Sequence, residues 1–203
     1  MGRAPFAFRG KSGGTLFDCG IGEAWSRLCA APAQCRLYGV SALAARHAAS
    51  FTRKQGPALI TDFRLGAVQV VLAKPQTFMN ESGVAVGQLL RFYQLPLERL
   101  LVAADELDLP LGTIRLRAEG GAGGQRGLQS IRDHAASQQV ARLRIGIDRP
   151  PGAMDAAEYV LRPFAAEQAA LLPVVLDEAA NAIECFVRDG ITVAMNRHNR
   201  EVG

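Results

Sequence analysis

Apolar and polar positions alternate with changing spacing from residue 40 onward, and each change of spacing predicts a new element. Short alternating or fully apolar runs predict strands, and apolar residues repeating every three to four positions predict helices. The expected strands are Pro57–Arg64, Val68–Lys74, Leu100–Ala104, Gly112–Arg117 and Arg142–Ile147. The expected helices are Val40–Ala49 (the end of a helix), Ser82–Tyr93, Leu128–Ala136, Ala165–Arg188 and Ile191–Asn199. Strands interspersed with helices predict an α/β fold, a single compact domain with a mixed, twisted sheet flanked by helices on both faces.

Residues 1–39 lack this regularity, because no helical or strand period is visible in them. Three of the four cysteines (Cys19, Cys29 and Cys35) and the single tryptophan (Trp25) fall in this segment. It contains no apolar core of a signal peptide, and its cysteine spacing matches no zinc-binding pattern. We therefore treat residues 1–39 as an anomalous segment and residues 40–203 as one α/β domain.

The composition narrows the class of protein. A chain of 203 residues, 49% of them hydrophobic, can bury a core in one domain, which excludes a disordered chain, a collagen and a small disulfide scaffold. No apolar run reaches the ~18–20 residues of a membrane span. The net charge is +4, and all but three of the 23 basic residues are arginines. Arginine is the better phosphate ligand, so nucleic acid is a candidate partner, although a GC-rich genome produces the same bias.

The segment Lys74–Asn80 lies between an expected strand and an expected helix, for which Ser82 is the candidate N-cap. Loops at the carboxyl ends of strands are where open α/β sheets bind ligands. Asn80 offers both hydrogen-bond donors and an acceptor, which suits a grip on a peptide group. The alternative is that Asn80 caps the helix beside a buried Phe78.

Two further segments carry candidate chemistry. Asp105–Pro110 follows the apolar strand directly, and a carboxylate there can orient a histidine base; a carboxylate pair for glycoside chemistry and a solvated turn are the alternatives. Gly120–Gly127 is glycine-rich but matches neither G-x-G-x-x-G nor a P-loop. Arg126 in this loop can hold a phosphate or a terminal ribose, and the alternatives are a mobile hairpin or a nucleotide-binding loop.

The chain contains three histidines, His47, His134 and His198, and each falls on an expected helix, where a surface or helix-end position is the default. Their spacing indicates no metal site, and no G-x-S-x-G motif indicates a serine hydrolase. The visible residues therefore supply an acid and an amide but no base.

Five segments follow one another in a familiar order: Lys74–Gly83 (KPQTFMNESG), Val102–Gly112 (VAADELDLPLG), Gly120–Ile131 (GGAGGQRGLQSI), Arg142–Ile147 (RLRIGI) and Ala194–Asn199 (AMNRHN). Together they resemble the bacterial-type peptidyl-tRNA hydrolase family, over roughly four-fifths of the chain. The resemblance implies hydrolysis of the ester between a peptide and the tRNA 3′ end, which recycles tRNA in ribosome rescue, without a metal or cofactor. It also implies a monomer in the cytoplasm that contacts the tRNA acceptor stem and 3′ end, and no membrane.

The resemblance implies a role for each matching residue. Asp105 matches the aspartate that orients the histidine base, Asn80 the amide that grips the substrate, and Phe78 the neighbouring aromatic. Arg126 stands where the family usually has asparagine, beside Gln125, where the family usually has histidine. We expect Arg126 to contact the tRNA end, although the residue at this position differs from the one that the family usually has.

The larger departure is at the front, where the family has a first strand, then G-x-G-N-P-G, a tyrosine and T-R-H-N with the catalytic histidine. The residues around His47 resemble that motif. However, His47 lies only 33 positions before Asn80 in the sequence, which is too few to hold the first helix that the family places between them. Codons for Leu16–Gly39, read one nucleotide later, permit L-I-V-G-L-G-K-P-G-P-A-Y-A-x-x-R-H-N-V-G-F-M. We therefore interpret residues 1–39 as out of frame and expect a chain that lacks its first strand and its base, and is impaired. The rival interpretation is a non-catalytic RNA-binding relative of the same fold, such as an organellar splicing factor with residues 1–39 as a leader.

Overall fold

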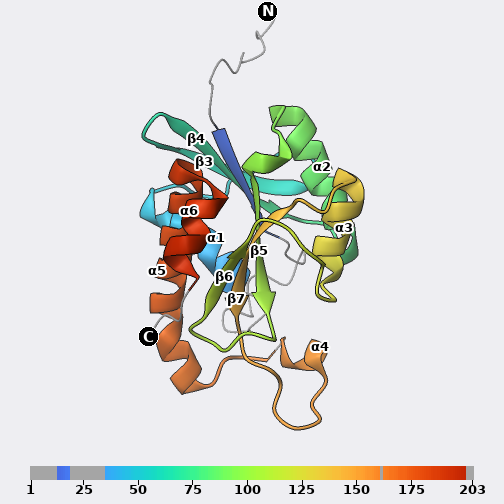
Figure 1. Ribbon diagram of the computed structural model, residues 1–203, viewed down its shortest axis with the longest axis vertical. Helices are drawn as coiled ribbons and strands as arrows, with labels where there is room; N and C mark the ends of the chain where they lie inside the picture. Colours follow the sequence, from blue (N-terminus) through green and yellow to red (C-terminus); the bar gives the residue numbers. More distant parts are fainter. Residues whose placement is uncertain (1–12, 19–34, 161, 200–203) are drawn as a thin grey trace, which may run out of the picture.

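Seven strands form one mixed sheet in the order β2-β3-β4-β1-β5-β7-β6 (Figure 1). The computed structural model describes residues 13–18, 35–160 and 162–199. The strands are β1 (Gly13–Asp18), β2 (Arg53–Lys54), β3 (Ala58–Leu65), β4 (Val68–Pro75), β5 (Leu100–Glu106), β6 (Ile114–Arg117) and β7 (Ala141–Gly146). Strands β4, β1, β5 and β7 run parallel, and antiparallel β3 with β2 and antiparallel β6 flank them. The carboxyl ends of the four parallel strands therefore meet at one end of the sheet, where such folds bind ligands.

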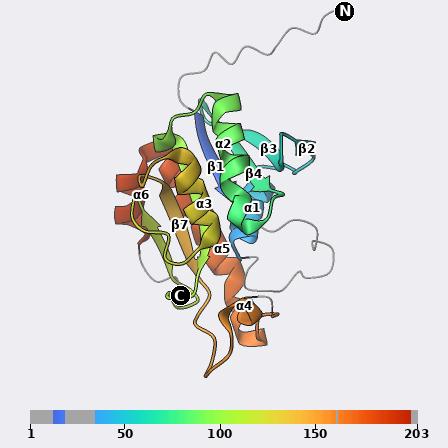
Figure 2. The same ribbon diagram turned by 90° about the vertical axis from the view of Figure 1, so that its right-hand side faces the viewer.

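Helices cover both faces of the sheet, as the sequence predicts (Figure 2). The helices are α1 (Cys35–Arg46), α2 (Ser82–Tyr93), α3 (Arg126–Ala135), α4 (Ala156–Tyr159), α5 (Ala166–Asp189) and α6 (Ile191–His198), with 3₁₀ turns η2 (Met79–Glu81) and η3 (Leu97–Arg99). One core cluster packs the sheet against α1, α5 and α6, and a second packs it against α2 and α3. None of the helices in the described residues is long and apolar enough to cross a bilayer.

The expected absence of the first strand is wrong. β1 pairs with β4 from Gly13↔Gln69 to Phe17↔Ala73 and with β5 from Thr15↔Leu100 to Asp18↔Ala103. Two buried parallel strands on either side leave their backbone groups unpaired unless a strand fills the space between them. The rest of the region in which the family carries its turn and histidine motifs, residues 19–34, lies outside the described residues.

The remaining elements agree with the predicted ones to within a few residues, apart from α1, which begins five residues before the predicted Val40. The expected N-cap of α2 is wrong, because Glu81 occupies that position and Ser82 is the first helical residue. The Ser82 hydroxyl instead donates backward to the carbonyl of Met79 at 2.9 Å. Strand β2 and helix α4 were not expected, and at two and four residues both are too short to show a period.

Candidate functional site

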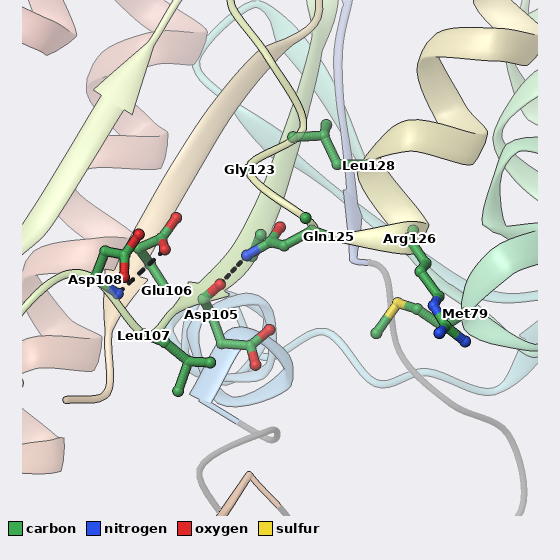
Figure 3. A pocket seen from close by; sticks show the side chains of 12 residues that line it. Met79, Asp105, Glu106, Leu107, Asp108, Gly123, Gln125, Arg126 and Leu128 are labelled. Atoms are coloured by element: carbon green, nitrogen blue, oxygen red, sulfur yellow. Dashed lines mark hydrogen bonds between the residues drawn. The ribbon is translucent and has the colours of Figure 1, made fainter. Parts of the chain in front are cut away.

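A pocket of about 250 Å³ opens at the carboxyl end of β5. Its lining comes from the end of β5 (Asp105 and Glu106), from Met79 of η2, and from the glycine-rich loop before α3. In Figure 3 the side chains of Asp105 and Arg126 approach this pocket from opposite sides, and Arg126 lies beside Met79. The pocket thus brings together the three segments that the sequence singled out, Lys74–Asn80, Asp105–Pro110 and Gly120–Gly127.

Gln125 ties the glycine-rich loop to the strand that carries the acid. Its side-chain amide donates a hydrogen bond to the backbone carbonyl of Asp105 (Figure 3). Gln125 is also the N-cap of α3, although its side chain makes no capping hydrogen bond because it is used for this contact. A glutamine here therefore acts as a clamp between loop and strand, and an amide cannot serve as a base near neutral pH.

A second pocket of about 360 Å³ contains Asn80. Gln125 and Arg126 line both pockets, so the two form neighbouring parts of one site around the start of α3. Arg126 is exposed and has no hydrogen-bond or ion-pair partner among the described residues. A free guanidinium between an amide and a carboxylate is suited to an anionic group of a substrate.

The loop before α2 places Asn80 and Phe78 at the surface of this site. Phe78 is 72% exposed and Asn80 is exposed, which contradicts the alternative of a capping asparagine beside a buried phenylalanine. Phe78 and Glu81 are the N-caps of η2 and α2, so Asn80 caps neither. An exposed aromatic side chain next to a polar pocket offers a stacking surface to a planar group.

Two glycines fix the elements that surround the site. Gly83 of α2 donates from its backbone N–H to the Ser130 hydroxyl at 3.0 Å, and a Cβ at Gly83 would lie 2.1 Å from the Ser130 carbonyl. A Cβ at Gly146 of β7 would lie 2.0 Å from the Pro110 carbonyl, so the acidic turn after β5 rests directly on β7. Only glycine permits these two close approaches.

The acidic turn is held by an ion pair below it. Glu106 is buried, and one of its carboxylate oxygens accepts hydrogen bonds from Nε and Nη2 of Arg144 at 2.6 Å. The other oxygen accepts from the backbone N–H of Asp108 at 3.2 Å. Glu106 is therefore a structural partner of arginine, and the geometry does not provide the free carboxylate pair that glycoside chemistry needs.

Arginines occupy alternate positions on the two antiparallel strands at the edge of the sheet. Their neighbours Ile114, Leu116, Leu143 and Ile145 belong to the core under α1, α5 and α6. Because side chains alternate between the faces of a strand, the arginines leave their strands on the opposite face, and the guanidinium of Arg115 donates to the carbonyl of Asn199 at the end of α6. The register places Arg115 opposite Arg144 and Arg117 opposite Arg142. We call these four residues the hairpin arginines, after the antiparallel pairing of β6 with β7, although α3 separates the two strands along the chain.

The three histidines all lie among the described residues, and none lines either pocket. His134 is in the last turn of α3 and His198 in the last turn of α6, as the default interpretation predicts. His47 hydrogen-bonds to Glu184 at 3.0 Å and stacks on Phe63 at 3.9 Å between ring centroids.

The position of Phe63 shows how far His47 lies from the site. Phe63 pairs with Val70, near the amino end of β4, whereas the site follows the carboxyl end of that strand at Pro75. Five residues of strand span about 16 Å. The structure therefore gives His47 a place near the opposite end of the sheet and removes it as the base.

The described residues contain no group of three or more His, Cys, Asp or Glu side chains placed to hold a metal ion. The side chains that the described residues bring to the two pockets include the carboxylate of Asp105, the amides of Asn80 and Gln125 and the guanidinium of Arg126, with the exposed ring of Phe78 nearby. Such a set can bind and orient a polar, anionic substrate.

Comparison with known proteins identifies the family of this chain. The family model described as peptidyl-tRNA hydrolase matches residues 37–202. The chain belongs to the peptidyl-tRNA hydrolase family. A curated peptidyl-tRNA hydrolase of Roseiflexus species strain RS-1 is 50% identical over 161 residues, which cover 79% of this chain and 74% of that protein. That of Chloroflexus aggregans is 45% identical over 161 residues, covering 79% of this chain and 86% of the relative.

The fold agrees with the same family. The crystal structure of peptidyl-tRNA hydrolase from Acinetobacter baumannii superposes with a TM-score of 0.83 at 29% identity, covering 93% of this chain and 96% of that one. The resemblance to this family and the predicted fold class are thereby confirmed. The family is one of carboxylic-ester hydrolases that act on peptidyl-tRNA.

Sequence reasoning found the segments of the site but missed the contacts between them. The clamp from Gln125 to Asp105 joins residues 20 positions apart, and no local pattern reports it. The hairpin arginines did leave a signal, since arginine recurs at every second position in I-R-L-R (Ile114–Arg117) and R-L-R-I (Arg142–Ile145). That alternation predicts one basic face once both segments are taken as paired strands.

Proposed function

We propose that this chain binds peptidyl-tRNA at the two pockets and the hairpin arginines, and that as written it hydrolyses the peptidyl ester poorly. Asp105 is the carboxylate that orients a histidine base, and Asn80 is the amide that grips the substrate. Phe78 and Arg126 contact the 3′ end of the tRNA. The observation that carries the proposal is that Asp105 and Asn80 line the site while all three histidines lie outside it.

The hairpin arginines support binding to the phosphates of the acceptor stem. Like charges directly opposite each other in a strand ladder are destabilising, and Glu106 is the single carboxylate within ion-pair distance of any of the four among the described residues. Arg117 is exposed and has no partner in that part of the chain. A polyanion that lies along this edge would relieve the repulsion, and RNA supplies such a charge.

The missing base explains why we expect the chain to be impaired rather than altered in specificity. Hydrolysis of an ester needs a group that removes a proton from the attacking water, and a positioned base contributes about 10²–10⁴-fold to the rate. Gln125 cannot replace it, because an amide nitrogen is not basic and its N–H is already donated to Asp105. The binding groups remain, so the loss falls on kcat rather than on substrate affinity.

The test compares the chain with a variant in which residues 16–39 carry the shifted-frame peptide with its Arg-His-Asn. The two are assayed for hydrolysis of a peptidyl-tRNA and for binding of a non-hydrolysable analogue. We expect a kcat at least about 100-fold higher in the variant at similar affinity. Asp105→Asn is the matched control: it should lower the rate of the variant and leave the chain as written unchanged. Equal turnover by the two proteins would contradict the proposal.

A non-catalytic RNA-binding relative is the second candidate, favoured by the same pairing of an arginine-rich edge with a site that has no histidine. The N-terminus of the mature protein and the codons of the gene distinguish this candidate from the impaired hydrolase. A mature protein that begins near residue 40 in an organelle would favour this candidate. A gene whose codons spell Arg-His-Asn in the shifted frame would instead support the out-of-frame origin of residues 1–39.

Two further expectations accompany the proposal. We expect a monomer, because the pockets and the hairpin arginines all come from one copy of the chain. We also expect it in the cytoplasm, by analogy with its bacterial relatives. Light scattering coupled to gel filtration should then give a mass near 21.7 kDa. A dimer at micromolar concentration would contradict the first expectation.

A further inference from the structure

The guanidinium of Arg126 belongs to both pockets, and its charge is unpaired. Arg126 is the first residue of α3, is exposed, and lines the pocket of Asp105 as well as the pocket of Asn80. Figure 3 shows it beside Met79, across the first pocket from Asp105. No carboxylate in the described part of the chain forms an ion pair with it. A guanidinium that stands at a substrate pocket without a counterion is available to an anionic group of the substrate.

The other acidic side chains around the two pockets are engaged elsewhere. Asp133 lines the second pocket, but its Oδ1 accepts a hydrogen bond from the Gln129 amide at 2.7 Å. It also lies two turns along α3 from Arg126, which is about 10 Å at 1.5 Å per residue. The two acids that line the first pocket beside Asp105 each pair with an arginine, Glu106 with Arg144 and Asp108 with Arg149. These acids therefore leave the charge of Arg126 to a ligand.

The lining of the second pocket is polar. Three amides line it (Asn80, Gln125 and Gln129), together with the Ser130 hydroxyl and, among the described residues, no apolar side chain larger than Ala122. An apolar group of the substrate placed here would cover amide groups without offering them hydrogen bonds, which is unfavourable. The pocket of about 360 Å³ therefore favours a polar or charged group of the substrate.

The chemistry of the peptidyl ester indicates which charged group can reach Arg126. In the proposed function the ester lies between Asp105, which orients the base, and Asn80, which grips the substrate. On one side of the ester is the terminal ribose, whose hydroxyls carry no charge. On the other side is the last residue of the peptide, whose α-carbon is bonded directly to the acyl carbon. A carboxylate on that residue matches a guanidinium, which can donate two parallel hydrogen bonds to its two oxygens.

We propose that Arg126 makes this chain bind peptidyl-tRNA that ends in glutamate or aspartate more tightly than peptidyl-tRNA that ends in a neutral residue. Arg126 is thus a specificity-determining residue on the peptide side of the ester. The inference rests on the proposed function, since it assumes that peptidyl-tRNA occupies the two pockets. The phosphate of the terminal nucleotide is the competing anion. An experiment can separate the two, because that phosphate is present whichever residue ends the peptide.

The test compares two acceptor-stem RNA minihelices that carry N-acetyl-glutamate or N-acetyl-glutamine at the 3′ end through an amide in place of the ester. The two ligands have nearly the same shape and differ in one charge. The parent should bind the glutamate ligand about 5-fold more tightly at low salt, the effect of one exposed ion pair, and the ratio should shrink as salt is added. Arg126→Gln should lose the preference, and Arg126→Lys should retain part of it.

Two further measurements control for indirect effects. Arg162→Gln removes the same charge from an exposed pair with Glu158 and should keep the preference of the parent. The melting temperature of Arg126→Gln should equal that of the parent, because an exposed side chain without a partner contributes little to stability.

Two outcomes would overturn the inference and leave the proposed function standing. In the first, the parent binds both ligands equally and more tightly than the bare minihelix. In the second, Arg126→Gln weakens both ligands by the same factor and keeps the preference, which would assign Arg126 to the RNA. Failure of the parent to bind either ligand would instead refute the proposed function together with this inference.

Discussion

Gly83→Ala tests whether the contact between α2 and α3 places the two halves of the site. The new Cβ would lie 2.1 Å from the Ser130 carbonyl and 2.4 Å from Nδ1 of His134. Since Cβ atoms do not approach other atoms within about 3.0 Å, the helices must separate by about 1 Å. Because η2 precedes α2 and Arg126 begins α3, that separation moves Asn80 away from Arg126.

The size of the effect follows from three terms. Overpacking costs about 1–3 kcal/mol, and the upper half applies because the obstacle is backbone rather than a flexible side chain. Weakening of the bond from the Gly83 N–H to the Ser130 hydroxyl, 3.0 Å long, adds about 1 kcal/mol. The higher helix propensity of alanine than of glycine offsets up to about 1 kcal/mol of this loss. The net loss is about 2–3 kcal/mol, or about 5–10 °C in melting temperature for a chain of this length.

The assay is urea and thermal unfolding, with Gly87→Ala as the matched control on the same helix. At Gly87 the nearest atom to a new Cβ is Nη1 of Arg91 at 4.0 Å, so the control gains propensity without a clash and should be up to about 1 kcal/mol more stable than the parent. The affinity for a fluorescent RNA minihelix with the sequence of a tRNA acceptor stem should fall in Gly83→Ala and stay constant in Gly87→Ala. Equal stability of the two variants would refute the idea that this contact sets the distance between the helices.

Two further predictions concern the acidic turn and the opposite face. Gly146→Ala should cost about 1–3 kcal/mol in urea unfolding, because its Cβ would meet the Pro110 carbonyl at 2.0 Å; unchanged stability would show that the turn yields. Burial raises the pKa of Glu184, but hydrogen bonds from His47 and Arg46 and the charges of nearby arginines outweigh it and hold the pKa below its ordinary value. The carboxylate therefore adds stability above about pH 4.5 that is lost as the pH falls through the lowered pKa. Glu184→Gln should lose about 1–3 kcal/mol at pH 7 and little in strong acid, and an equal loss at both pH values would contradict the assignment.

Sequence patterns predicted those parts of the fold whose signal is local. The predicted strands Val68–Lys74 and Leu100–Ala104 correspond to β4 and β5, and both lie inside the sheet. Strand β1 (Gly13–Asp18) escaped prediction because Gly-Gly-Thr begins it and no apolar period marks it. Its strand conformation depends on the unpaired edges of its two neighbours, which is information that a window of sequence does not contain.

Some features of the candidate site could likewise be predicted from the sequence and others could not. Asp105 and Asn80 could be placed from strand ends, because the carboxyl ends of parallel strands meet at one end of a sheet. The exposure of Phe78 could not be predicted, since a phenylalanine beside a helix start is as suited to the core as to the surface. The ion pair of Glu106 with Arg144 depends on β5 and β7 being neighbours in the sheet, which only the topology decides.

In the proposed function, the groups that bind RNA and the groups that perform the chemistry belong to separate elements. Phosphate contacts come from β6 and β7, whereas a base would stand opposite Asp105 at the end of β5. The clamp from Gln125 and the ion pair of Glu106 hold the β5 end in place without any histidine. Loss of the base therefore leaves the binding surface intact, and a chain of this kind is expected to sequester peptidyl-tRNA that it hydrolyses slowly. Such a protein competes with an active hydrolase for the same acceptor stem, and the competition disappears when the hairpin arginines are neutralised.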